Sequence, residues 1–99
     1  MDEYQDVIKQ LIAQEPTAII AFGSRVWGKT HKDSDLDVLV IKNTAKSHSD
    51  RIKEIHSQIS SRLPLDVIVL TPEEAKKFSH KYSFYRDIFQ KGEIIYGRI

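Results

Sequence analysis

Three short apolar runs constrain the fold more than any other feature of the sequence. They are Thr17–Phe22, Asp35–Ile41 and Leu65–Leu70, and β-branched side chains are frequent in all three. Apolar runs this short, bounded by turn residues or proline, are typical of buried strands, whereas helices need about ten residues or more. The chain is therefore expected to build a small sheet from strands that are mostly buried.

Segments with helical spacing alternate with these strands. The first places its apolar residues on one face and ends before Pro16, and the second extends from Ser47 to Leu63. A third begins at Thr71–Glu74, which combines an N-cap, an early proline and a capping-box glutamate. The residues Glu93–Tyr96 are expected to form a short edge strand. The pattern predicts an α/β or α+β fold in which a small mixed sheet packs against helices.

Composition limits the chain to one small domain. Its 99 residues carry 15 Lys and Arg, 14 Asp and Glu, and no cysteine. One compact core is expected over residues 1–99. A formal charge of +1 does not support nucleic-acid binding. The apolar runs are far shorter than the roughly 20 residues of a membrane span, and the acidic N-terminus does not resemble a signal segment. We therefore expect a cytoplasmic protein with no membrane partner.

Three aspartates occupy the beginnings of two strands. Asp35 and Asp37 are two positions apart, so in a strand they point to the same face, about 6.6 Å apart along the chain. Asp66 begins the third apolar run in the same way. Neighbouring carboxylates repel unless a cation lies between them, and Mg²⁺ prefers such oxygen ligands. Each aspartate alone is more simply a solvated strand-entry residue, but three together would be enough to hold two metal ions.

Gly23 and Ser24 follow the first strand directly. A glycine allows the backbone to approach a ligand closely, and free N–H groups at the start of a helical turn favour an anion. The Ser24 hydroxyl is able to add a hydrogen bond to a phosphate oxygen. Taken alone, the pair is more simply a turn glycine followed by a capping serine.

The stretch from Gly23 to Thr30 also satisfies the Walker A pattern of P-loop nucleoside triphosphatases. That motif requires its lysine, here Lys29, to open a helix, and a later strand must carry an aspartate at its far end. Lys29 is instead followed by a polar segment without helical spacing, and the aspartates begin their strands. We therefore interpret the match as accidental.

One longer motif resembles the G-S-x₁₀-D-x-D signature of the DNA polymerase β-like nucleotidyltransferase superfamily. It consists of Gly23-Ser24, ten intervening residues and Asp35-Leu36-Asp37. The stretch FGSRVWGKTHKDSDLDVLV is similar to that of its minimal nucleotidyltransferase (MNT) members. Asp66 in LPLDVIVL occupies the place of the superfamily's third carboxylate. The resemblance covers about residues 17–70, and no core position of the signature departs from it.

The resemblance implies a catalytic arrangement. Asp35 and Asp37 would hold two Mg²⁺ ions that clamp ATP, and Asp66 would be the third ligand and the base for the attacking hydroxyl. Gly23 and Ser24 would hold the β- and γ-phosphates, and the cations Arg25 and Lys29 would be available to neutralise them. Two cations placed in this way stabilise both the entering and the leaving oxygen at the α-phosphorus.

The resemblance also suggests a partner. MNT proteins are commonly the antitoxin of a pair with a HEPN-domain ribonuclease toxin, and transfer AMP from ATP to a toxin tyrosine or bind the toxin. Because the chain has no room for a domain that binds an acceptor, we expect the acceptor to be another protein. A non-catalytic module that neutralises its partner by contact is the alternative. Transfer to RNA or a small molecule is less favoured.

Other side chains have simpler interpretations. The four histidines share no ligand spacing and are expected on the surface. Phe78, Tyr82, Tyr85 and Phe89 recur at helical spacing and are more typical of a core than of a stacking surface. Trp27 and His31 lie in the polar segment before the aspartates, and the sequence assigns neither a role.

Overall fold

The computed structural model describes residues 3–23 and 36–98. Within these residues the order of elements is α1 (Glu3–Ile12), β1 (Ala18–Phe22), β2 (Leu36–Ile41), α3 (His48–Gln58), β3 (Leu65–Leu70), α4 (Pro72–Lys81), α5 (Ser83–Lys91) and β4 (Glu93–Gly97). Four helices and four strands thus confirm the predicted class, a small mixed sheet packed with helices. None of the helices in the described parts of the chain is long and apolar enough to cross a membrane.

The strands form one sheet in the order β3-β2-β1-β4. β2 pairs with β3 in parallel, whereas β1 runs antiparallel to both of its neighbours, β2 and β4. The parallel pair is connected through α3, as a parallel connection requires. Consequently the C-terminal end of β1 lies beside the N-terminal ends of β2 and β3.

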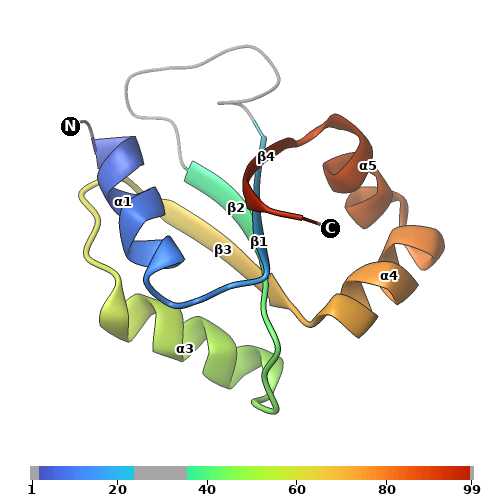
Figure 1. Ribbon diagram of the computed structural model, residues 1–99, viewed down its shortest axis with the longest axis horizontal. Helices are drawn as coiled ribbons and strands as arrows, with labels where there is room; N and C mark the ends of the chain where they lie inside the picture. Colours follow the sequence, from blue (N-terminus) through green and yellow to red (C-terminus); the bar gives the residue numbers. More distant parts are fainter. Residues whose placement is uncertain (1–2, 24–35, 99) are drawn as a thin grey trace.

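Helices cover both faces of the sheet (Figure 1). One face packs against α1 and α3 through a core that includes Leu11, Val38 and Ile55, all of them buried. The other packs against α4 and α5 around Leu39 and Ile88. Because strand side chains alternate between faces, consecutive residues of β2 contribute to the two cores in turn. Burial on both faces explains why the central strands are almost continuously apolar.

One predicted helix boundary is confirmed and one needs correction. α1 ends at Ile12, and Glu15 adopts a positive φ of 59°, so the residue before Pro16 does leave the right-handed helical region. The second helix was expected to reach Leu63, but α3 ends at Gln58 and Ile59 is its C-cap. The isoleucine spacing persists past the end of the helix because Ile59 still packs against the core from an extended conformation.

The aromatic stripe is divided between two helices. α4 ends where Tyr82 adopts an extended conformation, and α5 begins at Ser83. Phe78, Tyr85 and Phe89 pack against the core under these helices as predicted. Tyr82 differs from the prediction because it is 43% exposed at the junction of the two helices.

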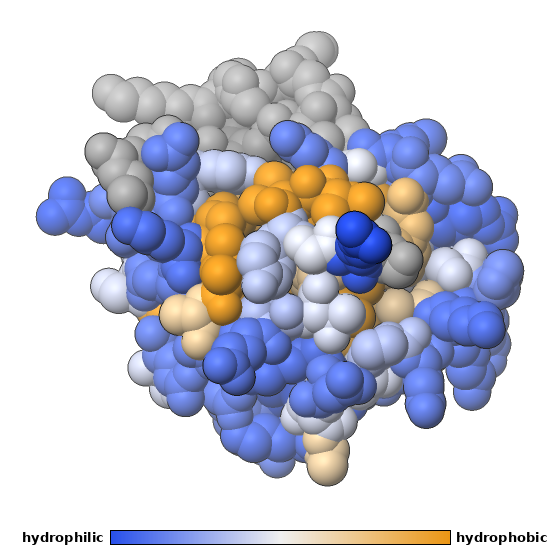
Figure 2. All heavy atoms as spheres, in the orientation of Figure 1, coloured by the Kyte–Doolittle hydropathy of each residue, from blue (hydrophilic) through white to orange (hydrophobic). Residues whose placement is uncertain are grey.

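β4 is an edge strand with apolar side chains on the surface. In the view of Figure 2, apolar residues gather near the centre of the molecule, over β4 and its surroundings. Ile94 is 54% exposed. The pairing of β4 with β1 shifts register between Ile19 and Ile20. Such an irregularity hinders the addition of a further strand at a sheet edge.

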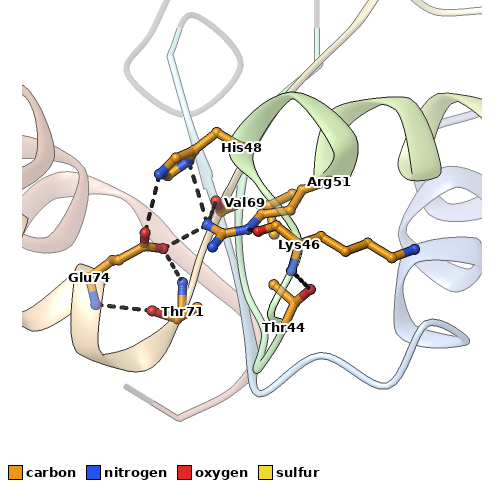
Figure 3. A network of polar contacts seen from close by, with 7 residues as sticks. All are labelled: Thr44, Lys46, His48, Arg51, Val69, Thr71 and Glu74. Atoms are coloured by element: carbon orange, nitrogen blue, oxygen red, sulfur yellow. Dashed lines mark hydrogen bonds and ion pairs between the residues drawn. The ribbon is translucent and has the colours of Figure 1, made fainter.

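A polar network joins α3, β3 and α4 (Figure 3). The guanidinium of Arg51, which is buried, donates through Nη1 to the Val69 carbonyl at 3.2 Å and to Oε1 of Glu74 at 2.7 Å. Its Nε donates to the Lys46 carbonyl at 2.8 Å. Nε2 of the exposed His48 lies 3.1 Å from Oε2 of Glu74. These contacts fix the end of β3 to the start of α4.

Several effects act on the pKa of Glu74. Burial alone would raise it, but the hydrogen bond from the Thr71 backbone N–H, the hydrogen bond and charge of Arg51, and the charge of His48 together outweigh burial. The pKa of Glu74 is therefore lowered. Glu74 thus contributes as an anion both to the network and to the capping box at Thr71.

Candidate functional site

Asp37 and Asp66 are direct partners in the parallel pairing of β2 with β3. Each is the second residue of its strand. Neighbouring strands lie about 4.8 Å apart, so two aspartates in register have their Cα atoms at about that separation. Asp37 is two positions from Leu39, and Asp66 is four positions from Leu70, so both aspartates lie on the face of the sheet that packs beneath α4 and α5. The fold thus brings together two carboxylates that are far apart in the sequence.

The two aspartates differ in their surroundings. Asp37 is partly buried on β2, an inner strand with a neighbour on each side. Asp66 is exposed and lies on β3, an outer strand of the sheet. A small ligand held at Asp37 would therefore lie over the sheet, whereas Asp66 can be reached by a large molecule approaching from the side.

Gly23 packs against Asp37. It follows the last residue of β1, and its φ is +81°, a conformation that L side chains rarely adopt. A Cβ added at this position would overlap Oδ2 of Asp37 and lie 3.0 Å from its Cγ. The site therefore requires glycine here for two reasons, its backbone conformation and the space that the carboxylate occupies.

The remaining predicted site residues lie outside the described part of the chain. They are Ser24, Arg25, Lys29 and Asp35, and the same holds for Trp27 and His31. Gly23 and Leu36, which flank that segment, are both next to Asp37 in the structure. Within residues 3–23 and 36–98, no group of three potential metal ligands is present. The two described carboxylates fit a divalent cation that prefers oxygen ligands, and the remaining predicted ligand, Asp35, lies outside the described residues.

An aromatic side chain that the sequence did not single out contacts Phe22, the neighbour of Asp37 on β1. Phe22 is the register partner of Asp37, and its ring contacts that of Phe84 at a centroid distance of 6.0 Å, nearly perpendicular. Phe84 is 52% exposed. Its position in α5 does not fall on the predicted aromatic stripe, so helical spacing gave no signal for it.

A separate hollow of about 490 Å³ lies near the other end of the sheet. Its lining includes Thr17, which precedes β1, and Ile41, which ends β2. Asp37 and Gly23 lie at the opposite ends of these two strands. The hollow is therefore separate from the carboxylate pair.

The antiparallel course of β1 bears on the Walker A match. In a P-loop protein the strand before the glycine-rich loop belongs to a parallel βαβ arrangement, whereas β1 is antiparallel to both neighbours.

Residues 5–98 match the family model described as Polymerase beta, Nucleotidyltransferase. The chain belongs to this nucleotidyltransferase family. Its general chemistry is the transfer of a nucleotidyl group, and the superfamily generally uses a nucleoside triphosphate with Mg²⁺. No curated protein matches the chain significantly.

Proposed function

We propose that this nucleotidyltransferase transfers AMP from ATP to a tyrosine hydroxyl of a partner protein. The observation that carries the proposal is the pairing of Asp37 with Asp66 beside Gly23. The pair lies where the G-S-x₁₀-D-x-D signature is expected to gather its acidic ligands. Its two carboxylates and the adjoining glycine suit a nucleotide phosphate bound through Mg²⁺.

The proposed roles follow from the positions of the residues. Asp37, together with Asp35, holds Mg²⁺, which neutralises the triphosphate and stabilises charge at the α-phosphorus. Gly23 and Ser24 bind the β- and γ-phosphates, with Arg25 and Lys29 as candidate neutralising cations. Asp66 accepts the proton of the acceptor hydroxyl as its oxygen bonds to the α-phosphorus and pyrophosphate leaves. Its exposed position on an outer strand suits an acceptor carried by another protein.

We further propose that the partner is a HEPN-type toxin and that the chain acts as its antitoxin. This step is supported by the similarity of residues 22–40 to MNT proteins, which commonly form such pairs. Covalent addition of AMP would add charge and bulk to the modified tyrosine of the toxin.

The direct test incubates the purified protein with Mg²⁺ and a lysate of its source cells, using ATP labelled at the α- or the γ-phosphate in parallel. We expect only α-label to become covalently attached to a second protein. Asp37→Asn and Asp66→Asn are expected to abolish labelling, because each removes a charged ligand. Asp50→Asn is the matched control, since Asp50 is exposed on α3 and outside the carboxylate pair.

Other outcomes would identify the alternatives. If Asp37→Asn still binds and neutralises the partner, and wild-type protein transfers no label, the chain is a binding module. Release of γ-phosphate that depends on Lys29 would instead restore the P-loop interpretation. Label on RNA or a small molecule would retain nucleotidyl transfer but replace the acceptor.

A further inference from the structure

Phe84 presents an aromatic ring to solvent and contacts Phe22, the register partner of Asp37. The ring is 52% exposed, although α5 otherwise directs apolar residues such as Ile88 into the core. Two nearly perpendicular contacts hold it, one with Phe22 at 6.0 Å and one with Tyr85 at 5.1 Å between ring centroids. In such edge contacts one ring's edge meets another's face, which fixes orientation without enclosing the ring. Phe84 is therefore a positioned surface aromatic.

The contacts of Phe84 place it on the side of the candidate site that β1 forms. Phe22, which Phe84 contacts, is the register partner of Asp37 and immediately precedes Gly23. Both Phe22 and Asp37 lie on the sheet face beneath α4 and α5. Asp66 lies on β3, on the far side of β2 from β1. Through its contact with Phe22, Phe84 therefore lies on the β1 side of the site, toward Gly23 and Asp37, and not on the side that Asp66 occupies.

We propose that Phe84 is a stacking platform for the base of the bound nucleoside triphosphate. The inference rests on the proposed function, in which Gly23 and Asp37 bind the triphosphate while Asp66 receives the acceptor. A planar group beside Gly23 and Asp37 then belongs to the nucleotide and not to the acceptor. Every nucleobase has a π-face, so stacking of this kind supplies affinity with little preference for one base over another.

The test compares the affinity of Mg²⁺-ATP with that of Mg²⁺-tripolyphosphate, which has the same phosphates but no base. Phe84→Leu preserves an apolar side chain against Phe22 while it removes the π-face. We expect ATP to bind about 5- to 150-fold more weakly to this variant, the range set by loss of one base–aromatic stack. Tripolyphosphate affinity is expected to remain unchanged, and Phe84→Trp is expected to retain ATP binding.

Tyr96→Leu provides the matched control. Tyr96 is 38% exposed, but its register partner is Ile19, which belongs to the core on the opposite face of the sheet. This variant is expected to bind both ligands as the wild type does. Circular dichroism and thermal unfolding of each variant establish that the fold is retained.

The possible failures can be told apart. If wild-type protein binds neither ligand, the proposed function is wrong and the stacking role falls with it. If Phe84→Leu leaves ATP affinity intact while wild-type protein transfers AMP, only the stacking role is wrong. An increase in KM for the acceptor protein, without a change in ATP affinity, would assign Phe84 to acceptor binding and overturn the proposal.

Discussion

The carboxylate of Asp37 fills the space that a side chain on Gly23 would need. The two residues come from antiparallel neighbours, Gly23 from the end of β1 and Asp37 from the start of β2. The lack of a Cβ at position 23 therefore allows the backbone after β1 to approach a charged group on the adjacent strand. A phosphate bound near Gly23 would lie within reach of a cation held by Asp37.

Gly23→Ala is expected to destabilise the protein and to weaken nucleotide binding. The substitution places a Cβ at a φ of +81° and against the Asp37 carboxylate, so it combines backbone strain with displacement of a ligand. Strain at a position of this kind costs about 1–3 kcal/mol in the free energy of unfolding, measured by urea denaturation. The displaced carboxylate is expected to reduce Mg²⁺-ATP affinity as well.

A double-mutant cycle separates the two contributions. In an Asp37→Ala background the carboxylate is absent, so Gly23→Ala should cost only the backbone strain and therefore less than in the wild type. Equal costs in the two backgrounds would show that Gly23 and Asp37 do not interact as the structure indicates.

Mg²⁺ is expected to raise the thermal unfolding midpoint of the wild-type protein, and chelation by EDTA is expected to reverse the rise. A cation between Asp37 and Asp66 relieves their repulsion and binds only the folded state. Asp37→Asn removes one charge of the pair, so the unfolding midpoint of this variant should respond little to Mg²⁺. An equal Mg²⁺ response in wild type and variant would contradict a metal site at the pair.

Glu74 is expected to make the protein sensitive to acid. Its pKa is lowered in the folded state, so its contribution to stability is present above the ordinary carboxylate pKa and is lost as pH falls through the lower, folded-state value. Urea denaturation between pH 7 and pH 2 should show wild-type stability falling below about pH 4, near the pKa of an unperturbed glutamate. The Glu74→Gln variant should have a lower free energy of unfolding than the wild type at neutral pH. Its free energy of unfolding should also decrease less as the pH is lowered.

Glu73→Gln is the appropriate comparison for this measurement. Glu73 is exposed, occupies the same first turn of α4 and is the immediate neighbour of Glu74 in the sequence. Its pH dependence should follow that of the wild type. If both variants lose the same part of the pH dependence, the Arg51–Glu74 contact is not its source.

Local signals in the sequence were sufficient for most of the secondary structure. The strand Leu65–Leu70 was predicted with its observed limits, and the capping box at Thr71 and Glu74 marked the start of α4. These features depend on residues within a few positions of one another, so propensity and spacing reveal them. The end of α3 was missed because Ile59 keeps the expected apolar position after the helix has stopped.

Patterns within the amino-acid sequence were enough to predict the elements, the family signature and the candidate ligands. Only the packing of the folded chain shows that Asp37 lies opposite Asp66, that Gly23 packs against Asp37, and that Phe84 contacts Phe22. Each of these contacts joins residues from different elements. Their proximity depends on strand order, register and helix packing, which are set by burial of both faces of the sheet and not by any local pattern.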